Sequence, residues 1–214
     1  MLSPTYFMIQ LRRIALAALV LAAIVVPASG APLSYTGNFV NDNDVVLIPF
    51  TLSDFSLVGF RTFGYGGGVN GAGQVILPGG FESMLQLFEL PSGAAVGGSM
   101  FPGTAPNSCS AGPQIPDPNR FGFCFDVFSQ LWLNAGDYIL ALTQNDNETA
   151  GSKLSDGFIY DAVPDFANGF QGLLGTQGDS HWALDITVSP EPGAALLIAP
   201  ALLLLGVMRR RRAN

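Results

Sequence analysis

Short runs rich in β-branched and aromatic residues, separated by Gly, Asn, Asp and Pro, fill the middle of this 214-residue chain. Between the two ends, no stretch of a dozen residues carries a 3.6-residue apolar stripe, so amphipathic helices are not predicted there. Several short strands joined by turn residues are typical of a β-sandwich or a barrel. The candidate strands are 33–40, 45–52, 57–63, 84–90, 124–133, 138–144 and 181–188.

The clearest strand pattern covers residues 126–144. Apolar residues recur at every second position around a turn at 134–136, with Leu131 and Leu133 before it and Leu140 and Leu142 after it. Alternation on both sides of a Gly-containing turn predicts a β-hairpin. Two other segments, 64–80 with its eight glycines and the polar stretch 145–178, are too long for ordinary turns. Long loops in a compact domain are usually functional or disordered, so binding is expected there.

The N-terminal segment has the pattern of an export signal. Arg12 and Arg13 precede thirteen apolar residues, 14–26, and small residues follow. A basic region, a short apolar core and small residues predict a signal peptide, with cleavage after Ala28 or Gly30. The apolar run is shorter than the ~20 residues that a membrane helix needs.

The C-terminal segment contains a second apolar run. Residues 193–208 carry no charge, and Arg209, Arg210, Arg211 and Arg212 follow them. Sixteen helical residues would measure about 24 Å, slightly less than a hydrocarbon core of ~30 Å. The run therefore predicts a marginal transmembrane helix whose arginines stay in the cytoplasm. The region between the two apolar segments would then lie outside the cytoplasmic membrane.

The predicted exported region is strongly acidic. Its 15 Asp and Glu residues face only Arg61, Arg120 and Lys153, which gives a net charge of −12, against −7 for the whole chain. Nucleic acids and anionic lipids bind through clustered Lys and Arg, so they are not expected partners. The classes of partner that remain are cations, neutral or basic polysaccharides and other proteins.

The only two cysteines, Cys109 and Cys124, both lie in the exported region. An even number of cysteines in an oxidising compartment predicts a disulfide. The bridge would close a loop of about 15 residues and contribute about 3 kcal/mol on the chain-entropy model.

Catalytic and nucleotide-binding motifs are incomplete. Gly66, Gly68 and Gly71 have dinucleotide-motif spacing, but the glycines and Pro78 that follow exclude the required helix. The single histidine, His181, lacks a Gly-x-Ser-x-Gly elbow or a His-Glu-x-x-His motif around it. Paired carboxylates remain open, but no spacing singles out a pair. We therefore do not expect an enzyme, and we predict no organic cofactor.

Calcium is the one cofactor for which candidate ligands exist. The clusters 41–44 and 145–148 follow predicted strands and contain Asp42, Asp44 and Asp146. Calcium binds six to eight oxygens, which Asp, Asn and loop carbonyls supply. Neither cluster completes an Asp-x-Asp-x-Asp-Gly loop, and the same residue types are common in turns, so both interpretations stay open.

The C-terminal 25 residues resemble a PEP-CTERM sorting signal. Pro190, Glu191 and Pro192 precede the apolar run, and the four arginines close it. The resemblance implies recognition by an exosortase, a membrane-embedded cysteine transpeptidase that would cut near Pro-Glu-Pro. It also implies a bacterium that makes exopolysaccharide.

Residues 33–188 resemble PEP-CTERM ectodomains related to pre-peptidase C-terminal (PPC-like) domains. The motifs are Tyr35-Thr-Gly-Asn-Phe39, Arg61-Thr-Phe63, Gly79-Gly-Phe81, Asn134-Ala-Gly-Asp-Tyr138, Gln144-Asn-Asp146 and Leu154-Ser-Asp-Gly-Phe158. This resemblance implies a single all-β, jelly-roll-like sandwich. The predicted organisation is a signal peptide at 1–30, the sandwich at 31–188 and the sorting signal at 189–214.

We predict an exported protein of the cell envelope or extracellular matrix, anchored in the membrane until an exosortase processes it. A structural or adhesive role with exopolysaccharide or biofilm is the main hypothesis. The alternative is a carbohydrate-binding module, and a secreted hydrolase is the weakest hypothesis. For carbohydrate binding, the candidate aromatic platform is Phe63, Tyr65, Phe81, Phe121 and Phe123.

Overall fold

The computed structural model describes residues 30–101, 125–172, 175 and 177–190. Contacts group Ser29–Ser189 into one compact unit. The predicted signal peptide, the predicted C-terminal helix and both cysteines lie outside the described residues. Within the described residues, no helix is long and apolar enough to cross a membrane.

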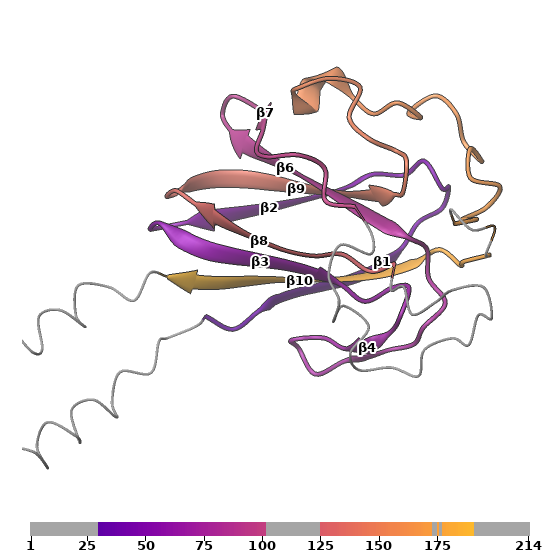
Figure 1. Ribbon diagram of the computed structural model, residues 1–214, viewed down its shortest axis with the longest axis horizontal. Coiled ribbons are helices and arrows are strands. Elements are labelled where there is room, and N and C mark those ends of the chain that lie inside the picture. The colour runs from indigo at the N-terminus through magenta and orange to yellow at the C-terminus, as the bar shows by residue number, and fades with distance from the viewer. Residues whose placement is uncertain (1–29, 102–124, 173–174, 176, 191–214) are drawn as a thin grey trace, which may run out of the picture. The chain divides into compact units, whose positions relative to one another are not determined.

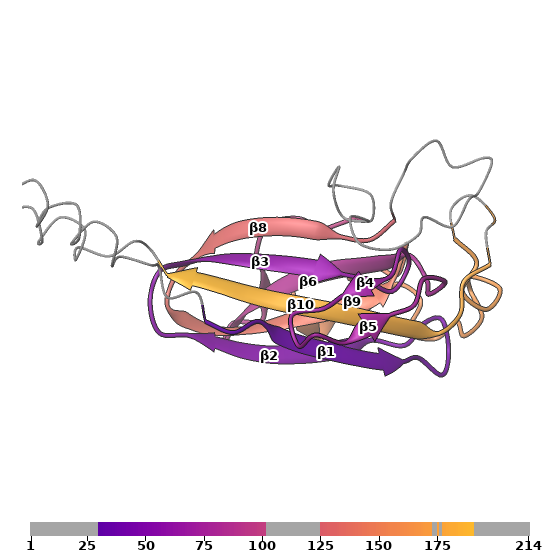
Figure 2. The same cartoon turned by 90° about the horizontal axis from the view of Figure 1, so that it is seen from below.

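The described chain is a β-sandwich of two four-stranded sheets. Figure 1 shows the sheets as two layers, and Figure 2 shows the first sheet in front. The first sheet has the order β1-β10-β3-β8, and the second has the order β2-β9-β6-β7. The strands are β1 (Leu33–Asn38), β2 (Val46–Leu52), β3 (Ser56–Thr62), β6 (Ser83–Leu90), β7 (Ala94–Ala95), β8 (Phe128–Leu133), β9 (Gly136–Gln144) and β10 (His181–Pro190).

All seven candidate strands have a counterpart in this sandwich. The largest change is at β8, which begins at Phe128 rather than at 124. Two-residue strands β4 (Gly68–Val69) and β5 (Val75–Ile76) form a separate antiparallel pair inside the glycine-rich segment. The prediction of an all-β sandwich is therefore confirmed.

The predicted hairpin between 126 and 144 is wrong. β8 pairs with β3 in the first sheet, whereas β9 lies between β2 and β6 in the second. The turn at 134–136 thus passes from one sheet to the other. Alternation arises in either arrangement, because Leu133 on β8 and Leu140 on β9 point into one core from opposite sheets.

The core fills the space between the sheets. Phe60 and Leu184 of the first sheet and Leu85, Leu87 and Leu142 of the second are at most 1% exposed. Burying such side chains fully contributes about 1.5–3 kcal/mol each before the entropy of ordering them. The sandwich therefore has its own hydrophobic core.

Two long segments cover the outer faces of the sandwich. The β4–β5 pair lies over the first sheet, where the Gly71 amide donates to the Asp185 carboxylate at 2.7 Å. Phe158 of the segment after β9 packs on Phe88 and Ala141, on the outer face of the second sheet. The segments predicted to be functional loops are thus tied to the sheets.

Candidate functional site

The structure does not form the predicted aromatic platform. Phe63, Tyr65 and Phe81 are 3%, 8% and 1% exposed, so they cannot offer their faces to a sugar. Phe81 stacks on Phe39 with 4.8 Å between ring centroids and on Phe170 with 5.4 Å. Burial of aromatic area outweighs exposure here, because the neighbouring glycines let the chain fold these rings inward. The other two members, Phe121 and Phe123, lie outside the described residues.

Most sorting-signal and cysteine predictions fall outside the described residues. Pro190 is the last residue of β10, and the description ends there. Beyond that end lie Glu191, Pro192 and the arginines Arg209, Arg210, Arg211 and Arg212. The internal gap at 102–124 contains both cysteines, Cys109 and Cys124. The sorting signal and the disulfide therefore stay predictions.

Two of the predicted calcium ligands hold backbone turns. The Asp44 carboxylate accepts from the amides of Val40 at 2.6 Å and Asn41 at 3.0 Å. Asp42 is 2% exposed, and its Oδ2 accepts from the Ala167 amide at 2.6 Å, while its Oδ1 has no hydrogen-bond partner. Among the residues described here, no three His, Cys, Asp or Glu side chains are grouped to hold a metal ion. Calcium binding stays a prediction.

The two acid-amide clusters fasten one distant loop. The Asn43 amide group donates to the Tyr160 carbonyl at 3.0 Å, and the Tyr160 amide donates to Asn147 Oδ1 at 3.1 Å. Asn147 is fully buried and also donates to the Asn43 carbonyl at 3.2 Å. A buried amide with partners on both sides resists displacement. Residues 41–44 and 145–147 thus position the segment 160–172, which sequence reasoning did not connect to either cluster.

Phe170 anchors the other end of this segment. It is 9% exposed and packs into the main core against Phe81 and Phe39. Its φ of 71° is in the left-handed region, which is unusual for a bulky side chain.

The described positive-φ residues other than glycine are Asp146, Asp165, Asn168 and Phe170, all within 146–170. Such conformations cost about 1–3 kcal/mol each for bulky residues, less for Asn and Asp, and they cluster at functional sites.

A pocket of about 230 Å³ lies between the end of β9 and this segment. Its lining combines amides, one carboxylate and two aromatic rings. The lining residues are Gln144, Asn145, Asp146, Tyr160, Phe166, Ala167, Asn168, Gln171 and Gly172. Tyr160 and Phe166 stack face to face, with 4.1 Å between centroids and 6° between the ring planes. Sequence reasoning expects binding within 145–178 but does not identify the two aromatic rings of this pocket.

The polar groups of the pocket are held in fixed orientations. Gln144 is 1% exposed, its Nε2 donates to the Gln171 carbonyl at 3.4 Å, and its Oε1 has no partner. The Asn145 amide group donates to Asp146 Oδ1 at 3.1 Å, and Gln171 Nε2 donates to the Gly175 carbonyl at 3.3 Å. One hydrogen of each of these three amide groups is thus used within the protein. A buried acceptor without a donor is uncommon and costs free energy until a partner supplies one.

A second polar network lies under the glycine-rich segment. Asp126 is fully buried, and its carboxylate accepts from the Thr62 hydroxyl and from the amides of Tyr65 and Gly66. Burial raises the pKa of Asp126 from 3.8 to about 6, although the bond from Gly66 opposes the rise. This carboxylate holds the start of the segment against the sheet.

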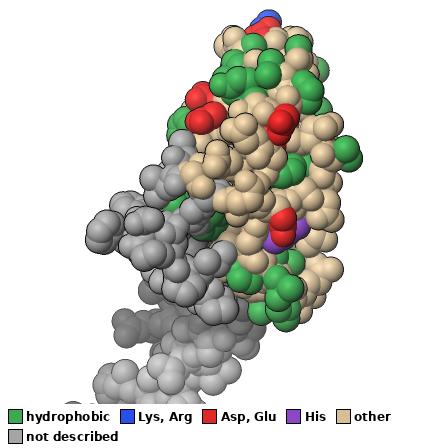
Figure 3. Space-filling model, turned by 90° about the vertical axis from the view of Figure 1, so that its right-hand side faces the viewer, with side chains coloured by type: hydrophobic (Ala, Val, Ile, Leu, Met, Phe, Trp, Pro, Cys, Tyr) green, Lys and Arg blue, Asp and Glu red, His purple; other side chains and the backbone are tan. Residues whose placement is uncertain are grey.

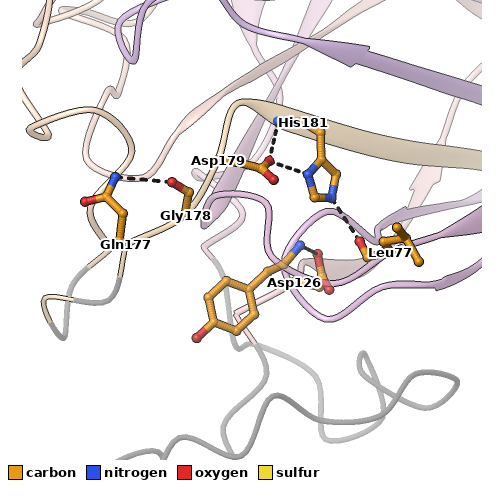
Figure 4. Close-up of polar contacts among 7 residues, drawn as sticks. Leu77, Asp126, Gln177, Gly178, Asp179 and His181 are labelled. Atoms are coloured by element: carbon orange, nitrogen blue, oxygen red, sulfur yellow. Dashed lines mark hydrogen bonds and ion pairs between the residues drawn. The ribbon is translucent and has the colours of Figure 1, made fainter.

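His181 fixes the other end of the same segment (Figure 4). Its ring Nδ1 contacts the Asp179 carboxylate, and its Nε2 hydrogen-bonds to the Leu77 carbonyl at 2.9 Å. Both ring nitrogens are therefore engaged by neighbours. The arrangement agrees with a structural role for His181 at the start of β10.

An exposed aromatic pair joins β8 to the turn between β2 and β3. Phe55 and Trp132 stack with 5.2 Å between centroids, and they are 42% and 52% exposed. The polar neighbours of Phe55 in the chain, Ser53, Asp54 and Ser56, hydrogen-bond among themselves. The pocket, in contrast, joins aromatic faces to oriented polar atoms.

No protein-family model matches the chain, and no curated protein matches it. Among solved structures, it is similar to a carbohydrate-binding module of lichenase 5A from Cellvibrio mixtus, in complex with cellotriose. The two are 10% identical, and the match covers 75% of this chain and 88% of the module with a TM-score of 0.27. A TM-score this low supports no conclusion about the ligand, so a ligand can be inferred only from the chemistry of the pocket.

Proposed function

We propose that this protein is a non-catalytic carbohydrate-binding protein of the cell surface or matrix, and that the pocket beside β9 is its sugar site. The carrying observation is the lining itself, which sets a stacked aromatic pair beside oriented amides and one carboxylate. Ligand sites are usually concave, with aromatic walls and a few placed polar groups.

The chemistry of the lining suits the hydroxyl groups of a sugar. Amide and carboxylate side chains of Asn145, Asp146, Asn168 and Gln171 can donate to or accept from hydroxyls, which themselves do both. The apolar face of a sugar ring packs on the aromatic rings of Tyr160 or Phe166. A volume of about 230 Å³ fits one or two sugar rings rather than a long buried chain.

The strand order supports the finer assignment of the fold as a jelly roll. Successive strands alternate between the sheets, except for β6 and β7, in the orders β1-β10-β3-β8 and β2-β9-β6-β7. Eight strands connected in this way make two interlocked Greek keys. A PPC-like ectodomain, which the sequence resembles, would have this general architecture.

The termini support a place outside the cytoplasm. We propose export by the N-terminal signal, transient anchoring by the C-terminal apolar run, and processing by an exosortase near Pro190-Glu191-Pro192. Mass spectrometry of the mature C-terminus in the native host tests this proposal. The expected mature protein lacks Arg209 to Arg212; an intact arginine tail would refute the sorting proposal while leaving sugar binding untouched.

Affinity electrophoresis tests sugar binding directly. The full chain in detergent is run through gels that contain one of several neutral or amino polysaccharides, and retarded migration is expected in at least one. Asn168→Gly removes a lining amide but keeps the left-handed backbone, and Gln171→Ala removes another. Each should weaken binding by about two- to tenfold, the range for one neutral hydrogen bond.

Gln130→Ala is the matched control, because Gln130 is exposed on β8 and does not line the pocket. It should migrate like the unchanged protein. No retardation in any gel, or equal retardation of all variants, would rule out this site.

A further inference from the structure

We propose that the pocket selects sugars that carry a free, protonated amine, such as oligomers of 2-amino sugars, over neutral or acidic ones. The inference rests on the proposed function and specifies its ligand class. It follows from three observations: the charge of the lining, the direction of its hydrogen bonds and an unmatched buried acceptor.

The lining has one charged residue, and it is an acid. Asp146 is exposed at the pocket, and no Lys, Arg or His belongs to the lining. The segment that forms the outer wall adds two more exposed carboxylates, Asp161 and Asp165. Figure 3 shows acidic side chains spread over this end of the molecule and almost no basic ones. A negative concave surface attracts a cation and repels an acidic sugar.

The hydrogen bonds inside the lining favour a ligand that donates. The amide groups of Gln144, Asn145 and Gln171 each already donate to an oxygen of the protein. Gln144 Oε1 has no partner, although the residue is 1% exposed and lines the pocket. An ammonium group has three donors and no acceptor, whereas a hydroxyl has one donor. The lining thus offers the Asp146 carboxylate and the unpartnered Gln144 Oε1 as acceptors, which an ammonium matches better than a hydroxyl does.

Matched oligosaccharides separate amine recognition from sugar recognition. The full chain is titrated at pH 6 with glucosamine oligomers and with their fully N-acetylated counterparts of equal length, since acetylation removes the positive charge and two of the three donors while adding a neutral acetyl group. We expect the free-amine form to bind at least about fivefold more tightly at about 0.1 M salt. The preference should shrink at about 1 M salt, where the Debye length falls from about 10 Å to about 3 Å.

Two variants of equal chemistry localise the effect. Asp146→Asn removes the lining charge at a left-handed position, with φ of 71°, that Asn also tolerates. Asp165→Asn makes the same change at φ of 66° in the same segment but outside the lining. We expect the first to abolish most of the preference for the amine and the second to retain most of it, because Asp165 adds only to the general negative charge of the outer wall and does not line the pocket.

The outcomes distinguish this inference from the proposed function. Equal or tighter binding of the acetylated oligomer, or an amine preference that survives Asp146→Asn, overturns amine selection but leaves sugar binding in place. Binding of neither oligomer, nor of any polysaccharide in the electrophoresis panel, overturns both.

Discussion

The substitution Asp126→Asn isolates the effect of one buried carboxylate on the pH dependence of folding. Asp126 is 0% exposed and accepts three hydrogen bonds, at 2.9 Å from Thr62, 3.2 Å from Tyr65 and 2.7 Å from Gly66. Those bonds favour the charged form and lower the pKa, but the removal of water from around the carboxylate has the larger effect and raises its pKa to about 6. Asparagine has nearly the same shape and does not titrate.

The magnitude follows from proton linkage. The Asp126 carboxyl has a pKa of 3.8 in the unfolded chain and of about 6 in the folded chain, so it stays protonated up to a higher pH when the protein is folded. Between these values the folded state binds more protons, so this group makes the protein more stable as the pH falls. A rise of about two pKa units corresponds to about 3 kcal/mol in all, of which about 2 kcal/mol lies between pH 7 and pH 4.5.

Urea unfolding of the wild-type chain and of Asp126→Asn at pH 7 and pH 4.5 measures this contribution. Other carboxylates titrate alike in both proteins, so they cancel in the difference. Relative to the variant, the wild type should gain about 2 kcal/mol on acidification, or about 1 M in urea midpoint for a slope near 2 kcal/mol/M. A constant difference at both pH values would show that Asp126 ionises at its usual pKa, and a relative loss in acid would show that its pKa is lowered in the folded state; either result would refute the reasoning.

Three further predictions address the backbone, the metal and the disulfide. Gly80→Ala places a Cβ against the backbone of Gly64, 2.8 Å from its carbonyl oxygen, and should cost about 2 kcal/mol or more in thermal or urea unfolding. Gly98→Ala, with nothing within 4 Å of its Cβ, should be near neutral, and equal effects would contradict the packing argument. Calcium should raise the melting temperature if Asp42 binds it, and a midpoint unchanged by chelator would dispose of the site. Reducing the predicted Cys109–Cys124 bridge should cost about 3 kcal/mol, whereas free thiols in native mass spectrometry would refute the bridge.

The strands could be predicted because their signal is local. A strand alternates its side chains wherever its partner lies, so the pattern of 138–144 predicts a strand without any information on its neighbours. Pairing is not local, and the turn at 134–136 carries no information on whether the chain returns to the same sheet or crosses to the other. β8 and β9 were therefore recognised correctly as strands and paired wrongly.

The site could be predicted only in outline. The stretch 145–178 was expected to bind because of its length, and the pocket does lie against it. The aromatic platform predicted elsewhere, on the loops around Phe63 and Phe81, is wrong for its described members, because glycines at 64–80 let Tyr65 and Phe81 turn inward. The only sequence signal for the rings of the pocket is that Tyr160 and Phe166 are aromatic residues within an acidic, polar stretch. Tyr160 is held in place by accepting a hydrogen bond from Asn43 and donating one to Asn147, and no sequence spacing reveals these bonds.

The same arrangement separates the parts of the molecule that can change ligand preference from those that hold the fold. Phe170 and Asn147 are buried and position the pocket wall, so their loss should affect stability and binding together. Asp146, Asn168 and Gln171 are exposed and line the pocket without supporting the core. Substitutions at these three exposed positions can therefore alter the charge and hydrogen bonding offered to a sugar at little cost in stability, because surface changes away from packing are usually within about 0.5 kcal/mol.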